Sequence, residues 1–404
     1  MMTNSKNIIL PLSFIGLMFF SIGFALGINS FLVPVLQSSM NLPAGVTYLL
    51  IAATFLPFLI FGLPAASCIT KIGYRRTMAL SFWIFALGFG GFILSAYLQN
   101  FYLFLLASLI SGAGNAFLQA AINPYITILG PIESAAKRMS IMGVCNKLAW
   151  PVSPLFFALL VPDSANVSVS DLYIPFSIII VIFIALSVVS MLAPLPEVKA
   201  VGEDSDDDNE SVTECKYAEN KSSIWQFPHL ILGAITLFVY VGVETLSLGT
   251  AVDYATTIGL KDPDLYAWVP SVGMVVGYIF GILFIPRLLS QEAAMRICAV
   301  IGLSGAVAMV LLPITLSIWA LFVMSLGCSI LWPALWPLAI ADLGQFTKSG
   351  SGLLTMAIAG GAVIPTIFGF LKDVVGAQQA YWLAVPCFAI IFFYGFAGYK
   401  IRTK

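Results

Sequence analysis

Three amide side chains recur at helical spacing inside a strongly apolar stretch of the sequence. Asn115, Gln119 and Asn123 are four positions apart, so on an α-helix they share one face. Bilayer hydrocarbon offers amides no partner, and leaving one unpaired costs ~1–3 kcal/mol per group. Amides carry donors and acceptors together, which suits a solute with vicinal hydroxyls. The stripe predicts a polar cavity for such a solute. Interhelical packing is the alternative, above all for Asn115.

Four more apolar stretches, from both halves of the chain, carry polar or aromatic side chains with the same periodicity. They are Asn29 and Ser30 beside Gly23 and Gly27, then Asn146, Trp150 and Ser153, then Thr236, Tyr240, Glu244 and Ser247, and finally Ser325, Ser329, Trp332 and Trp336. Small residues and hydroxyls also mark packing faces, and tryptophans also form interfacial belts. Stripes from both halves predict one central cavity, whose tryptophans offer a flat apolar face to the C–H side of a sugar ring.

Two charged residues lie deep within these stretches and are candidates for ion coupling. Glu244 is the clearest carboxylate in the middle of a stretch, and Lys147 lies about two turns into another. An ionised group at that depth is costly, so such groups usually face a cavity or a partner. Three roles stay open for Glu244: proton exchange, a permanent ion pair with Lys147, or sodium binding with nearby hydroxyls and carbonyls.

The elements that must position these residues are membrane-spanning helices. The 404-residue chain is 60% hydrophobic and only 9% charged, whereas a soluble domain carries about 25% charged residues. Apolar runs near the ~20 residues that cross a bilayer recur along the whole chain. The pattern predicts an all-α integral membrane protein with transmembrane helices at residues 10–36, 46–69, 78–98, 101–129, 139–160, 172–194, 229–257, 266–285, 296–313, 318–341, 352–371 and 380–399.

One long polar segment divides the twelve predicted helices into two groups of six. It covers residues 195–228 and contains "GEDSDDDNESVTE", so we expect a flexible acidic linker, or alternatively a regulatory segment, between bundles at 1–194 and 229–404.

The basic residues predict the orientation in the membrane. The loops on the side opposite the linker carry only Lys261 and Lys372, whereas the linker's side carries Lys71, Arg75, Arg76, Lys137, Arg138, Arg287, Arg296, Lys348, Lys400, Arg402 and Lys404. The positive-inside rule then places both termini in the cytoplasm.

Missing motifs narrow the function further. The chain has no GxxxxGK[ST] phosphate-binding loop, no CxxC pair among its cysteines, and His229 as its single histidine. We therefore expect no metal, no cofactor and no enzymatic activity. The formal net charge of −1, with many of the acids in the linker, gives no indication of nucleic-acid binding. Two groups of membrane helices without a nucleotide motif are typical of a secondary transporter.

Several longer segments resemble a known family. The segment "QAAINPYITILGPIESAAKR", followed by "MSIMGVCNK", resembles the glucose/galactose transporter branch of the fucose–galactose–glucose:proton symporter family, within the major facilitator superfamily. "SSIWQFPHLILGAITLFVYVGVE" at 222–244 and "SGSGLLTMAIAGGAVIPTIFG" at 349–369 resemble the same branch. The resemblance implies a facilitator fold of two six-helix bundles, a central sugar site, cytoplasmic termini and hexose import across a bacterial inner membrane.

The chain departs from the family pattern at positions that bear on ion coupling. Family members often carry an Asn-Asp pair in the first span, where this chain has Asn29-Ser30. Fucose carriers have a glutamate at the position of Gln119, although the glucose/galactose branch also uses glutamine. An arginine expected after Gly277 is replaced by Tyr278. The sequence therefore predicts a hexose importer working by alternating access and leaves open whether a proton, a sodium ion or no ion is coupled. Carriers of another sugar, a polyol or a siderophore, and a membrane sensor, are the alternatives.

Overall fold

The computed structural model describes residues 9–128, 135–161, 167–193, 221–284, 290–343 and 346–401, and all regular secondary structure within them is helical. Within these residues, 12 helical segments are long and apolar enough to cross a membrane. The predicted all-α membrane fold is therefore confirmed. The acidic core of the predicted linker, residues 203–214, lies outside the described residues.

The N-terminal half comprises the helices before residue 194. They are α1 (Ile9–Met40), α2 (Ala44–Thr47), α3 (Leu49–Phe55), α4 (Pro57–Tyr97), α5 (Phe101–Ile128), α6 (Ala135–Leu160), the 3₁₀ turn η3 (Val169–Leu172) and α7 (Tyr173–Leu192). Helix α4 packs against α5 and α7, and α1 packs against α6. Helix α4 combines the end of the predicted span 46–69 with most of the span 78–98. The chain kinks between them at Gly73, whose backbone φ of 82° is one that glycine adopts without strain.

The C-terminal half comprises the described helices from residue 221 onward. They are η4 (Ile224–Gln226), α8 (Pro228–Gly249), α9 (Ala251–Thr257), η5 (Pro263–Ala267), α10 (Trp268–Phe284), α11 (Gln291–Leu311), α12 (Ile314–Ser317), α13 (Ala320–Cys328), α14 (Leu331–Ile340), α15 (Thr347–Ala357), α16 (Gly360–Val375), η7 (Gln379–Leu383), α17 (Ala384–Phe396) and η8 (Gly398–Lys400). Helix α8 packs against α16, and α11 packs against α13 and α17. The predicted span 229–257 is thus divided into α8 and α9, and the predicted span 318–341 into α13 and α14.

Close helix packing accounts for the glycines of the first predicted stripe. A Cβ atom on Gly23 would collide with the backbone carbonyl of Asn146 in α6, and one on Gly27 would collide with that of Trp150. Residues without side chains are what allow two membrane helices to approach at backbone distance. These glycines therefore form the α1–α6 packing face.

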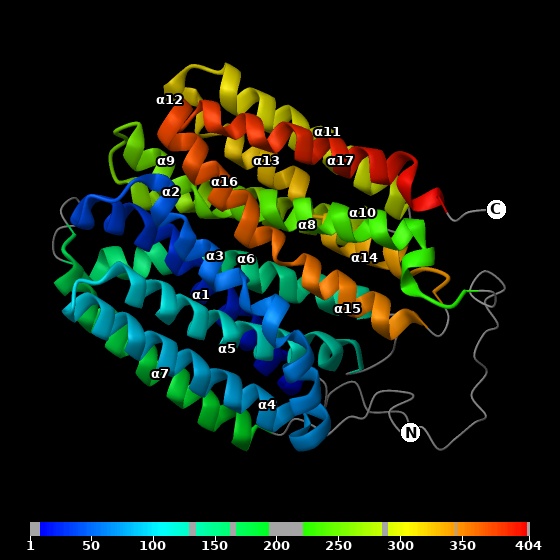
Figure 1. Ribbon diagram of the computed structural model, residues 1–404, viewed down its shortest axis with the longest axis horizontal. Helices are drawn as coiled ribbons and strands as arrows, with labels where there is room; N and C mark the ends of the chain where they lie inside the picture. The colour runs from blue at the N-terminus through cyan, green and yellow to red at the C-terminus, as the bar shows by residue number, and fades with distance from the viewer. Residues whose placement is uncertain are drawn as a thin grey trace.

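The two ends of the bundle can be told apart in Figure 1. The first described turn of α1 and the last of α17 lie at one end, termed the termini end. The short helices α2, α9 and α12 lie at the opposite end, termed the far end. The halves meet through α6 and α10 and through contacts of α16 with α2 and α3. Lys372, expected in a loop, lies in the last turn of α16.

Candidate functional site

A cavity of about 120 Å³ lies between the two halves. The N-terminal half contributes wall residues from α1, α3, α5 and α6, and the C-terminal half contributes them from α8, α10 and α14. The structure brings eight of the candidate residues together, since the wall includes Gln119, Asn123, Asn146, Lys147, Trp150, Tyr240, Glu244 and Trp332. The predicted helix faces from both halves therefore meet at one place.

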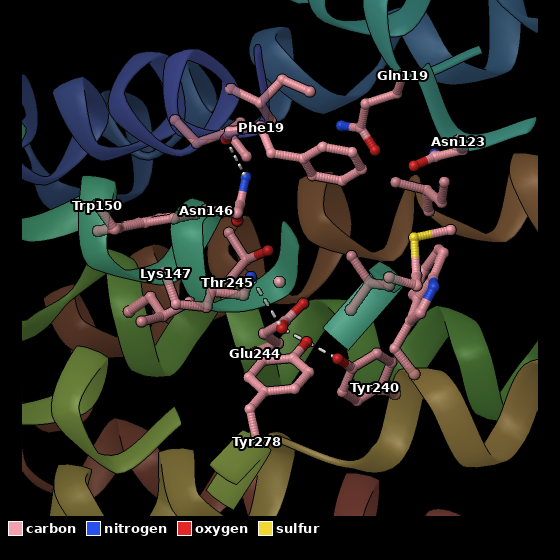
Figure 2. Close-up of a pocket in the computed structure, with 18 of the residues that line it drawn as sticks. Phe19, Gln119, Asn123, Asn146, Lys147, Trp150, Tyr240, Glu244, Thr245 and Tyr278 are labelled. Atoms are coloured by element: carbon pink, nitrogen blue, oxygen red, sulfur yellow. Dashed lines mark hydrogen bonds and ion pairs between the residues drawn. The ribbon is translucent and has the colours of Figure 1, made fainter. Parts of the chain in front are cut away.

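The amides of α5 form one side of this cavity. Gln119 and Asn123 are one helical turn apart, and Figure 2 shows both amide groups directed into the cavity, opposite Tyr240 and Glu244. Gln119 Nε2 donates to Oδ1 of Asn115 at 2.9 Å, which fixes the orientation of the glutamine. The Gln119 carbonyl and the whole Asn123 amide have no hydrogen-bond partner among the described residues. They are available to a solute.

A third amide, Asn146 of α6, is held by the backbone of α1. Its Nδ2 donates to the carbonyl of Phe19 at 3.1 Å, across the close α1–α6 packing face. Nothing within the described part of the chain donates to its Oδ1, and the residue lines the cavity. Asn146 therefore presents a fixed acceptor, whereas Asn123 presents a donor and an acceptor.

An ion pair crosses the cavity between the two halves. Lys147 Nζ of α6 lies 3.0 Å from Oε1 of Glu244 in α8, and the side chains are only 10% and 12% exposed. The same oxygen accepts a hydrogen bond from the Tyr240 hydroxyl at 3.0 Å, one helical turn away (Figure 2). The other carboxylate oxygen, Oε2, has no partner among the described residues. The sequence offered this pairing as one alternative, and the structure shows that the two groups meet.

Aromatic rings complete the wall. Trp332 lies at the start of α14, with its ring centroid 6.5 Å from that of Tyr240 and 5.3 Å from that of Trp336. Trp150 of α6 presents its ring 5.8 Å from the ammonium of Lys147. Flat apolar faces thus stand beside the amides and the ion pair, an arrangement suited to a ring with polar edges and apolar faces.

Several predicted residues lie outside the cavity wall, namely the candidate site residues Asn29, Ser30, Asn115 and Trp336 and the stripe residues Ser153, Thr236, Ser247, Ser325 and Ser329. Asn29 donates to the hydroxyl of Thr54 at 3.2 Å, and Asn115 is buried behind Gln119. Trp336 stacks behind Trp332. These residues lie behind the wall residues, because only part of each polar helix face borders the cavity.

Some wall residues were missed by the sequence analysis. Tyr278 of α10 lines the cavity, although it was noted only as the replacement of an expected arginine. Thr245 and Met139 also line it. None of the three belongs to a stripe of polar residues at helical spacing, which was the pattern that indicated candidate site residues. In the part of the chain that the structure describes, no cluster of three or more His, Cys, Asp or Glu side chains could hold a metal ion.

Comparison with known families supports this architecture. The sequence profile of the Major Facilitator Superfamily matches residues 15–365. The chain belongs to this superfamily. Membership confirms the predicted family and the prediction of a transporter, and it makes this facilitator protein a multi-pass membrane protein.

Curated relatives cover nearly the whole chain. The glucose/galactose transporter of Brucella abortus biovar 1 (strain 9-941) is 31% identical over 415 residues, covering 98% of this chain and 96% of its own. The L-fucose-proton symporter of Escherichia coli (strain K12) is 26% identical, covering 99% and 95%. Both relatives are sugar transporters by name.

Solved structures share the fold. The crystal structure of the facilitator transporter FucP in the outward conformation matches with a TM-score of 0.70 at 24% identity, covering 98% of this chain and 99% of that one. An inward-facing bacterial homologue of the human lysosomal transporter Spinster matches with a TM-score of 0.70 at 14% identity, covering 96% of each chain. The facilitator fold predicted from the sequence is therefore confirmed.

Proposed function

We propose that this facilitator protein imports a hexose by alternating access, with a proton as its co-substrate. The observation that carries the proposal is the composition of the cavity. Amides of α5 and α6 face an ion pair and aromatic rings contributed by the other half. The names of the relatives, which are transporters of glucose, galactose or fucose, point to the same class of solute.

The cavity fits a single sugar ring in its chemistry. Gln119, Asn123 and Asn146 supply donors and acceptors for hydroxyls, while Trp332 supplies an apolar face. A monosaccharide matches both features. A predominantly apolar drug would leave the amides unpaired at ~1–3 kcal/mol each.

The ion pair provides a physical basis for proton coupling. Oε1 of Glu244 is occupied by Lys147 and Tyr240, whereas Oε2 is free to accept a proton or a sugar hydroxyl. Protonation of Glu244 would cancel its charge and release Lys147, which belongs to the other half. Because the pair joins α6 to α8, its formation and release favour different arrangements of the halves.

The relatives are bacterial, and we place the protein in a bacterial inner membrane. In the sequence, the basic residues are concentrated in the loops on the linker's side, so the positive-inside rule predicts that both termini and the acidic linker are cytoplasmic. The described helices before residue 194 and from residue 221 onward then form the two bundles that rock around the cavity.

The direct test is counterflow in proteoliposomes. Vesicles loaded with unlabelled glucose, galactose or fucose should take up the labelled sugar. Gln119→Ala and Asn123→Ala should each weaken the apparent affinity by about 5- to 150-fold, which corresponds to ~1–3 kcal/mol for an unpaired hydroxyl. Asn100→Ala is the control, because this amide is exposed and caps the start of α5. Absence of exchange for every hexose would contradict the proposal and favour a polyol or another solute.

A further inference from the structure

A second group of charged residues joins the two halves at the far end, apart from the cavity. Asp253 of α9 is only 2% exposed and accepts three hydrogen bonds. Lys372 Nζ of α16 donates to its Oδ1 at 2.7 Å and to its Oδ2 at 2.8 Å. The hydroxyl of Tyr48, from the N-terminal half, donates to Oδ2 at 2.7 Å. This carboxylate is fully paired and buried where the halves meet.

The residue after Lys372 makes a parallel contact across the same boundary. The two carboxylate oxygens of Asp373 accept the backbone N–H groups of Ala44 and Gly45, at 2.8 Å and 2.7 Å. The ring of Phe370 in α16 packs directly over Gly45, where any side chain would collide with it. The first turn of α2 is therefore held by α16.

These contacts divide into two kinds. The ion pair between Lys372 and Asp253 lies wholly within the C-terminal half. The bonds from Tyr48 to Asp253, and from the α2 backbone to Asp373, cross between the halves. Parting of the halves at this end would therefore break hydrogen bonds and apolar contacts but no ion pair, and the charge of Asp253 would remain compensated by Lys372.

Because no ion pair of this group crosses between the halves, the contact between the halves at the far end is reversible. Separating a buried ion pair leaves an uncompensated charge, which is strongly destabilising. A hydrogen bond whose groups become hydrated on opening costs far less, because water replaces the lost partner. Along the chain, the wall residue Leu248 comes five positions before Asp253, and the wall residue Phe55 comes seven positions after Tyr48, so the contact adjoins the cavity.

We propose that Tyr48, Asp253 and Asp373 form a latch that holds the far end of the transporter closed and must open before a solute reaches the cavity from that side. The role rests on the alternating-access transport proposed above. Lys372 keeps Asp253 charge-compensated in both states, so the latch can close and open in every cycle.

Distances between spin labels test the latch directly. One label pair, Tyr102→Cys with Lys261→Cys, spans the halves at the far end, where both native side chains are exposed. A second pair, Lys261→Cys with Ile314→Cys, lies within the C-terminal half. Both are placed in the full-length chain with its six native cysteines replaced. Distance distributions are measured by pulsed electron resonance in lipid nanodiscs.

Tyr48→Phe and Asp373→Asn should each add a longer distance between the halves and raise the open-to-closed ratio by about fivefold per hydrogen bond lost. The distance within the C-terminal half should stay unchanged. Gln378→Ala is the matched control, because this far-end amide bonds only carbonyls of its own half, those of Met309, Val310 and Leu312. It should leave both distances as in the wild type.

Two results would overturn the latch. One is a distance between the halves that is unchanged in both variants. The other is a simultaneous broadening of the distance within the C-terminal half, which would show that the contacts only support local structure. Neither readout depends on which solute is carried, so failure of the hexose assignment and failure of the latch are distinguished.

Discussion

Trp150 donates its indole N–H to the hydroxyl of Ser30, with 3.0 Å between Nε1 and Oγ. Ser30 donates in turn to the backbone carbonyl of Leu248, at 3.5 Å and across the boundary between the halves. The only polar atom of Trp150 is thereby paired, while its ring remains in the cavity wall. Ser30 occupies the position where family members often carry an acid, and here it supports the wall from behind.

Replacing Ser30 with alanine should therefore act through Trp150. The buried indole N–H would lose its acceptor, at a cost of ~1–3 kcal/mol in the free energy of unfolding. Sugar affinity should fall less than in Trp150→Ala, because the ring itself remains. Thermal unfolding and binding of labelled sugar measure the two effects. Ser38→Ala, on the exposed part of the same helix, is the control. Equal losses of sugar affinity in Ser30→Ala and Trp150→Ala would refute the supporting role of Ser30.

The two tryptophans of α14 should differ in their effect on binding. Trp332 lines the cavity, whereas Trp336 stacks behind it. Removing a ring that contacts the sugar loses an interaction of about 0.5–1.5 kcal/mol beyond the buried area. Trp332→Ala should weaken binding several-fold more than Trp336→Ala. Isothermal titration with the transported sugar measures the difference, and a larger loss in Trp336→Ala would place the sugar elsewhere.

The acidic linker is expected to act as a spacer. Residues 203–214 can then be replaced by a Gly/Ser segment of equal length without loss of transport, because a flexible spacer needs reach rather than a particular sequence. Counterflow per inserted protein measures the outcome. A variant that inserts normally and no longer transports would indicate that the segment regulates or gates the cycle.

The sequence predicted the helices and eight of the polar and aromatic residues of the cavity wall, because both follow from local patterns. Twelve apolar runs match the spans of the structure, since the thickness of the bilayer fixes their length. Polar residues inside such runs are rare and costly, so Gln119, Asn123 and Glu244 were distinguishable by type and spacing alone. The helical period placed them on common faces.

What the sequence did not predict depends on contacts between distant segments. The approach of Lys147 to Glu244, and of Tyr48 to Asp253, is decided by how the halves dock. The width of each helix face left open whether Asn115 or Trp336 would reach the cavity. Tyr278 lies on a helix with few polar side chains and was not assigned to a stripe. Helix periodicity assigns a residue to a helix face, and tertiary packing decides whether its side chain reaches the cavity.

The central claim is that Glu244 couples proton movement to sugar movement through its pair with Lys147. Accumulation and counterflow of the same labelled hexose, measured in proteoliposomes with an inward proton gradient, test it most directly. The wild type should concentrate the sugar. Glu244→Gln should abolish accumulation and retain counterflow, because exchange of identical sugars requires no net proton movement. Asp262→Asn, an exposed far-end carboxylate, should behave as the wild type. Accumulation by Glu244→Gln, or a wild type that never concentrates sugar, would contradict the account.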